Sequence, residues 1–112
     1  MKRFVIEIPG AEPGQLEAIA REAGQMEGVQ DTGVSQTRGL DPASLMAWVQ
    51  LGSAVASAVG AAVPVIQKIL DLLRVRGHKN AHIRFPDGTE IQVEATPEEV
   101  ARLLAKTRGE DA

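Results

Sequence analysis

The stretch from residue 83 to residue 93 reads IRFPDGTEIQV. Apolar and polar side chains alternate on both sides of its Pro-Asp-Gly-Thr sequence, which is the two-residue period of strands with one buried face. Proline and aspartate favour a type I turn, and Gly88 supplies the left-handed conformation that closes it. The stretch therefore predicts a β-hairpin that packs Ile83, Phe85, Ile91 and Val93 against a core.

A helix start follows the hairpin directly. Residues 96–99, TPEE, match the capping box, in which a threonine and a glutamate three positions later each bind the other's backbone amide. Apolar residues then recur at helical spacing at Val100, Leu103 and Leu104. We expect this helix to end near Thr107 and residues 108–112 to form a frayed tail.

The segment before the hairpin is unusual because residues 42–67 carry no formal charge. Asp41 and Pro42 are typical of a helix start, and the small residues Gly52, Ala56 and Gly60 fall four apart. We therefore expect a long central helix over residues 42–76, with a small-residue stripe that lets another helix approach closely. Pro64 should kink or split it near Val63.

The N-terminal third predicts a strand, a helix and a weaker strand. Phe4, Ile6 and Ile8 alternate with Arg3, Val5 and Glu7, and a helical repeat follows at Leu16, Ile19, Ala20, Ala23 and Met26. Residues 29–37 are rich in β-branched residues but contain Gly33, which suits an edge strand. The whole order is β-α-β-α-β-β-α, so we expect residues 1–112 to form one α+β domain with a sheet of three or four strands.

Composition excludes several classes of protein. The 112 residues include no cysteine, which excludes a disulfide scaffold, thiolate metal sites and thiol catalysis and fits a reducing compartment. The net charge of −3 and the three aromatic residues argue against nucleic-acid binding. Glu7 and Pro9 interrupt the apolar N-terminus too early for an export signal. We therefore expect a cytoplasmic protein.

Residue patterns for chemistry are mostly missing. His78 is expected in a loop and His82 on the polar face of a strand, with no nucleophile motif beside them, and no glycine spacing matches a phosphate loop. We expect no catalytic, cofactor or metal site. A locally basic set is either an anion site or a solvated helix end; its members are Lys68, Arg74, Arg76, His78, Lys79 and Arg84.

Two uses of the central segment remain open. If the helix is buried, its free stripe would contact a partner helix or a second copy of the chain, and the lone Trp48 would serve as core filler or as an interface hot spot. The candidate partner-binding residues are Trp48, Gly52, Ala56 and Gly60. Alternatively, residues 42–67 are long enough to anchor a small protein in a membrane, although Gln50, Pro64 and the many small residues lower their apolarity.

The second half of the chain resembles the bacterial effector-associated constant component family. The similarity lies in GLDP at 39–42, the small-residue segment, LLRVR at 72–76, the hairpin sequence at 83–95 and EEVARLL at 98–104, roughly 70 residues in all. The resemblance implies a non-enzymatic adaptor or regulatory component of a bacterial conflict (defence) system. It would bind or control a separate effector, such as a trypsin-like or caspase-like peptidase.

Overall fold

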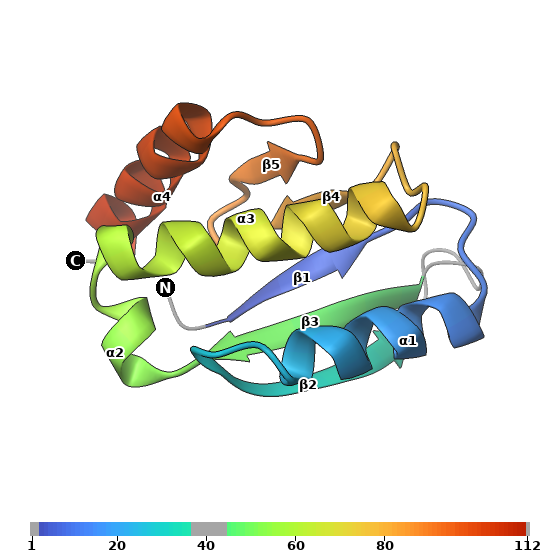
Figure 1. Ribbon diagram of the computed structural model, residues 1–112. Coiled ribbons are helices and arrows are strands. Elements are labelled where there is room, and N and C mark those ends of the chain that lie inside the picture. The colour runs from blue at the N-terminus through green and yellow to red at the C-terminus, as the bar shows by residue number, and fades with distance from the viewer. Residues whose placement is uncertain (1–2, 37–44, 112) are drawn as a thin grey trace.

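The computed structural model describes residues 3–36 and 45–111, which form an α+β fold with five strands and four helices (Figure 1). Their order along the chain is β1 (Arg3–Glu7), α1 (Pro13–Gly24), β2 (Val29–Gln36), β3 (Leu45–Leu51), α2 (Ser53–Ala56), α3 (Val59–Val75), β4 (His82–Arg84), β5 (Glu90–Gln92) and α4 (Pro97–Asp111). The α+β class is confirmed. The predicted order and the predicted three or four strands are wrong, because a strand replaces the first part of the central helix.

The five strands form one antiparallel sheet in the order β2-β3-β1-β4-β5. Strand β3 lies between β1 and β2, and β1 lies between β3 and β4. This is the split β-α-β, or ferredoxin-like, arrangement, extended at one margin by β5 and α4. The arrangement describes topology and by itself implies no function.

Residues 45–51, which the sequence predicts to be part of the central helix, form β3. Ala47, Val49 and Leu51 are buried in the core, and Met46 and Trp48 point to the opposite face. Strand β3 pairs with β1 on one side and with β2 on the other, so its backbone groups are bonded on both sides. The helix start predicted at Asp41 and Pro42 lies outside the described residues.

The helical part of the central segment begins only at Ser53, after Gly52. Helices α2 and α3 meet at Ser57 and Ala58, where Ala58 is extended (φ −139°, ψ 122°), rather than at Val63 and Pro64. Helix α3 continues through Pro64, although the proline removes one intrahelical hydrogen bond. The packing of its buried side chains on the sheet outweighs that loss. These side chains are Ala62, Val65, Ile66, Ile69, Leu70 and Leu73.

The membrane anchor that is the alternative for residues 42–67 requires one continuous helix. Residues 45–51 of that segment instead form a strand between β2 and β1. Among the described helices, none combines the length and the apolarity that crossing a bilayer requires.

The C-terminal hairpin and the capping box are confirmed. Phe85 and Thr89 close the turn through an N–H···O bond of 2.9 Å, and Gly88 has a φ of +94°. The Glu99 amide donates to Thr96 Oγ1 and the Thr96 amide donates to the Glu99 carboxylate, both at 3.2 Å. Helix α4 runs to Asp111 and does not end near Thr107; Gly109 costs it about 1 kcal/mol relative to alanine, which is too little to end it.

The helices α1 and α3 lie on one face of the sheet, where the core forms (Figure 1). Every strand residue predicted to face the helices is buried, and the Phe4 and Phe85 rings pack 5.5 Å apart. Leu16, Ile19, Val100 and Leu104 are buried from the helix side, and Leu103 is partly buried. Strand β2 lies at a margin of the sheet, as predicted, with a register irregularity between Val29 and Asp31.

Candidate partner-binding face

The second face of the sheet is not covered by any of the described helices. Cross-strand pairing fixes which side chains share it, because paired residues point to the same side. Trp48, Val5, Arg84 and Glu90 form one row across four strands, and Met46, Glu7, His82 and Gln92 form the next. We call this surface the open face: Arg3, Val5, Glu7, Met46, Trp48, Gln50, His82, Arg84, Glu90 and Gln92.

The centre of the open face is apolar. Val5 and Trp48 are cross-strand partners, and Met46 follows on the same side of β3. All three side chains are half-buried by their neighbours. A half-buried strip of valine, methionine and tryptophan on a sheet face has the composition of the centre of a protein interface.

Trp48 is held in place from two sides. The Arg3 guanidinium lies over its ring, 5.0 Å from the centroid, and Gly33 on β2 lies beneath it. A Cβ at Gly33 would come within 2.6 Å of the indole, so the ring can lie across β2 only because residue 33 has no side chain. Gly33 was predicted from the sequence only as a sign of an edge strand, and the tryptophan contact explains why it stands there.

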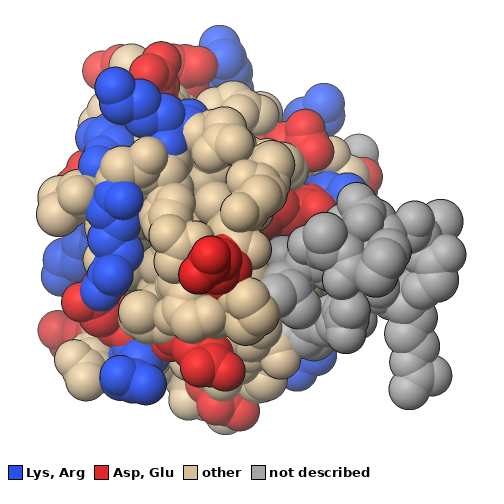
Figure 2. All heavy atoms as spheres, turned by 90° about the vertical axis from the view of Figure 1, so that its right-hand side faces the viewer, with Lys and Arg blue, Asp and Glu red and all other residues tan. Residues whose placement is uncertain are grey.

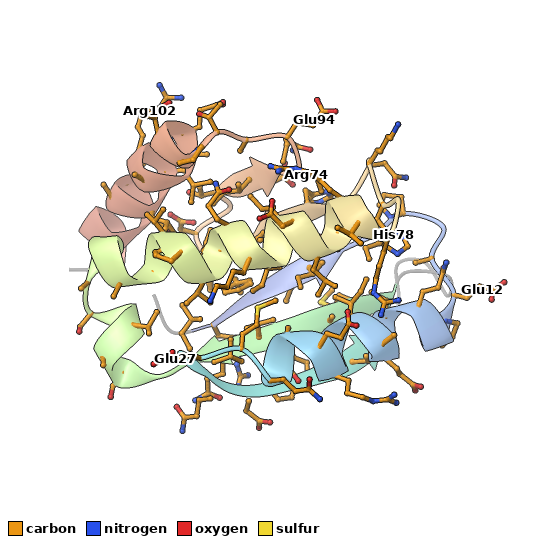
Figure 3. All side chains as sticks on the ribbon, in the orientation of Figure 1. Glu12, Glu27, Arg74, His78, Glu94 and Arg102 are labelled. Carbon is orange, nitrogen blue, oxygen red and sulfur yellow. The ribbon has the colours of Figure 1, made fainter. Side chains whose placement is uncertain are left out.

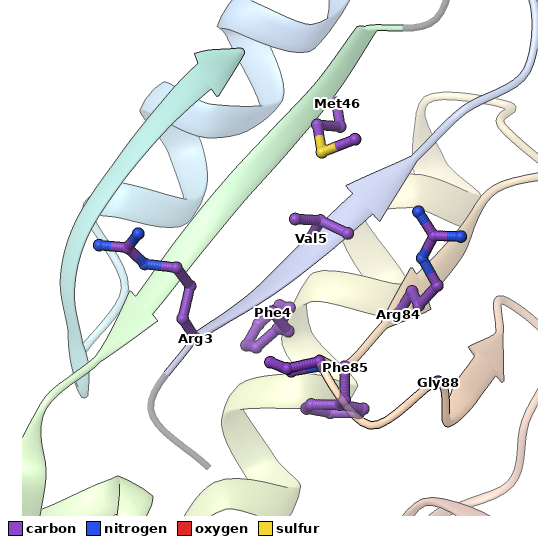
Figure 4. A pocket seen from close by; sticks show the side chains of 8 residues that line it. Arg3, Phe4, Val5, Met46, Arg84, Phe85 and Gly88 are labelled. Atoms are coloured by element: carbon purple, nitrogen blue, oxygen red, sulfur yellow. The ribbon is translucent and has the colours of Figure 1, made fainter. Parts of the chain in front are cut away.

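A pocket of about 410 Å³ opens next to this strip. Figure 4 looks onto it and shows Arg3 and Arg84 on opposite sides, with Val5 and Met46 between them. Phe4, Phe85, Pro86 and Gly88 complete the lining. The pocket therefore combines an apolar floor with two cationic side chains, which suits an apolar group that carries a negative charge.

A chain of polar contacts crosses the open face from β1 to β5. Arg84 Nε forms an ion pair with Glu7 Oε1 at 2.9 Å, and Arg3 donates to the Gln50 side chain at 3.1 Å. His82 Nε2 lies 3.3 Å from Glu7 Oε1 and 3.6 Å from Glu90 Oε1. The two arginines at the pocket therefore differ, since Arg84 already has a carboxylate partner and Arg3 is bonded to a neutral amide.

The three arginines of the basic set each pair with a different carboxylate: Arg74 with Asp71, Arg76 with Glu22 and Arg84 with Glu7. Arg74 donates to the Val93 carbonyl at 2.9 Å and pairs with Asp71, so it points toward the segment after β5 (Figure 3). Arg76 Nε donates to Glu22 Oε2 of α1 at 3.0 Å, and this hydrogen bond lowers the pKa of the Glu22 carboxyl. Acidic side chains lie among the basic ones at this end of the molecule (Figure 2).

The four residues predicted to bind a partner are not brought together on one helix. Trp48 lies on the open face, Gly52 precedes α2, Ala56 is buried, and Gly60 is exposed in the first turn of α3. The close-packing stripe depended on a continuous helix, so the strand β3 and the break at Ser57 remove it. Of the four, Trp48 is the one that belongs to the open face.

The other residues of the open face come from strands that are far apart in the sequence. Their spacing along the chain therefore does not indicate that they share one surface. Their signal is the alternation in β1, β4 and β5, which marks a second, more polar side. Searches with this chain against protein-family models, curated proteins and solved structures found no match.

Proposed function

We propose that the protein is a non-enzymatic adaptor that binds a separate effector protein through the open face of its sheet. The observation that carries the proposal is the half-buried strip of Val5, Met46 and Trp48, which lies on a sheet face that the described helices leave uncovered. The resemblance to the effector-associated constant component family supports an effector of a bacterial defence system, such as a trypsin-like or caspase-like peptidase.

The residue types on this face favour protein binding over chemistry. Tryptophan and arginine are the residues most enriched at interface hot spots, and Trp48 is already fixed between Arg3 and Gly33, so its binding would cost little conformational entropy. The histidine of the face, His82, has the carboxylates of Glu7 and Glu90 as its neighbours among the described residues, not a hydroxyl or an amine. This arrangement does not activate a nucleophile.

The pocket indicates what part of the effector it would take. Its floor of Val5, Met46 and Phe85 suits an apolar side chain, and Arg3 at its side suits a carboxylate next to that side chain. The occupant we propose is therefore a segment of the effector in which a large apolar residue stands beside an aspartate or a glutamate.

The test begins with a pull-down from the native host, read by mass spectrometry, and continues with the purified pair in a calorimeter. We expect recovery of a peptidase effector. We expect Trp48→Ala and Met46→Asp to weaken its binding at least about tenfold, the loss typical of a hot spot. Val75→Asp is the matched control, because Val75 is an 86% exposed apolar residue outside the open face.

Three results would overturn the proposal. One is equal binding by the Met46→Asp and Val75→Asp variants, which would place the effector elsewhere. Another is turnover of a substrate by the purified protein alone. The third is loss of self-association in light scattering on Met46→Asp, with no effector recovered, which would make a second copy of the chain the occupant of the face.

A further inference from the structure

Three potential metal ligands meet on three adjacent strands, at the side of the open face away from Trp48. Glu7 of β1 is the cross-strand partner of His82 of β4, and Glu90 of β5 lies diagonally opposite His82. One ligand atom from each lies within 4.8 Å of the other two. We propose that Glu7, His82 and Glu90 bind a divalent transition-metal ion of the zinc type.

The distances leave room for a shared ion, because the His82–Glu7 hydrogen bond is long for a charge-assisted pair and the His82–Glu90 separation is longer still. His82 Nε2 lies 3.3 Å from Glu7 Oε1 and 3.6 Å from Glu90 Oε1, whereas charge-assisted hydrogen bonds are about 2.7–2.9 Å long. In a tetrahedral zinc site with bonds of about 2.0–2.2 Å, neighbouring ligand atoms lie about 3.3–3.6 Å apart. The two separations from the imidazole match that spacing, and an oxygen of Glu7 lies within 4.8 Å of one of Glu90.

The donor set selects the class of ion. One imidazole nitrogen and two carboxylate oxygens suit Zn²⁺ and related transition ions, whereas Mg²⁺ and Ca²⁺ prefer oxygen ligands alone. The side chains of His82 and Glu7 are 20% and 25% exposed, so they are sheltered but reachable, and Glu90 is 45% exposed. Three protein ligands leave a fourth position open toward solvent, where water or a group from another molecule can bind.

Arg84 acts on the site in two ways. Its Nε forms an ion pair with Glu7 Oε1 at 2.9 Å, so it competes with a bound ion for that oxygen. Its positive charge also repels a cation, so it lowers the affinity. We therefore expect Arg84→Gln to bind Zn²⁺ more tightly than the natural chain.

The experiment titrates Zn²⁺ into the purified chain, with calorimetry for affinity and NMR of the two imidazoles for location. The chain has only two histidines, His78 in the loop after α3 and His82. We expect one ion per chain and a saturating shift of the His82 signals, with His78 unchanged at the same Zn²⁺ concentration. Mg²⁺ should give no shift.

Matched variants separate this site from unspecific binding. His82→Gln and Glu90→Gln should weaken Zn²⁺ binding at least about tenfold, the loss expected for a removed ligand. His78→Gln and Glu94→Gln should bind like the natural chain, and circular dichroism should show all four variants folded.

The proposal fails if no heat and no His82 shift appear up to about 1 mM Zn²⁺, or if the two histidine variants bind equally. It also fails if the His78 signals respond in parallel with those of His82. These measurements use the chain alone, so they stand or fall independently of the effector proposed above.

Discussion

Gly33 shows how one missing side chain shapes the open face. Its position is the single place where the described part of β2 faces the Trp48 ring in direct register. The indole therefore lies flat across two strands and is covered by Arg3 on its other side. The most prominent side chain of the face depends on a residue that contributes none.

We expect Gly33→Ala to lower the free energy of unfolding by about 1–3 kcal/mol, because a methyl group 2.6 Å from the ring must displace it. Trp48 is the one tryptophan of the chain, so its emission should shift to longer wavelength as the ring becomes more exposed. Denaturant titration and fluorescence measure the two effects. Gly14→Ala is the control, since a Cβ there meets no described atom within 4 Å; an identical response of both variants would contradict this account of Gly33.

The Arg76–Glu22 pair makes stability depend on pH in a predictable direction. The hydrogen bond from Arg76 lowers the pKa of Glu22 below its ordinary value of 4.5 in the folded chain. The stabilisation is complete above that value and is lost as the pH falls through the lower, folded pKa. The temperature of half-unfolding should therefore fall less steeply in Arg76→Gln than in the natural chain as the pH is lowered from about 5 to about 3. The control is Arg102→Gln on α4, and a curve for Arg76→Gln that overlays that control would contradict the prediction.

At the scale of the element, Pro64 stands inside α3 without ending it. The proline cannot donate a hydrogen bond to the carbonyl four residues earlier, and its side chain is exposed, so it adds little packing. We expect Pro64→Ala to raise the free energy of unfolding by about 2 kcal/mol, because alanine restores the bond while the unfolded chain gains some freedom. A chemical denaturation curve measures the change. A loss of stability would mean that the proline ring supports α3 through contacts.

Helices and strands could be predicted where turn-forming or helix-capping residues mark their ends. The hairpin carried Pro86 and Gly88, and α4 carried a capping box, so local chemistry determined both. Strand β3 had no charged or turn-forming residue between it and α2 except Gly52, so strand and helices merged into one uncharged run. The alternation of Ala47, Val49 and Leu51 was present, but Ala and Leu also suit a helix. The pairing of β3 with strands on both sides decided between the two.

The open face was beyond prediction for a related reason. Glu7, His82 and Glu90, or Val5 and Trp48, become neighbours only through the strand order β2-β3-β1-β4-β5. The sequence indicated that His82 lies on a polar strand face, but which side chains surround it follows from pairing between distant segments. Contacts within one hairpin or one helix could be predicted, and contacts between β1, β3 and β4 could not.

At the scale of the whole molecule, one core joins the original sheet to its C-terminal extension. Buried residues of the four helices and of β1, β3, β4 and β5 form a single cluster, from Phe4 on β1 to Leu104 on α4, and β2 packs the partly buried Val29 and Val34 against it. We expect β5 and α4 to unfold together with the rest. Trp48 fluorescence reports on the sheet and far-ultraviolet circular dichroism on the helices, so the two thermal transitions should coincide. A separate, earlier helical transition would show that α4 is an independently unfolding unit.

The two margins of the sheet carry a further consequence. An unpaired strand margin can template the addition of another chain and so begin fibril growth. Here β5 has only three residues and begins with Glu90, while β2 is irregular between Val29 and Asp31. Short, charged or irregular margins are the devices by which natural proteins discourage such addition. The molecule can thus keep one broad sheet surface available for recognition and still resist aggregation through its edges.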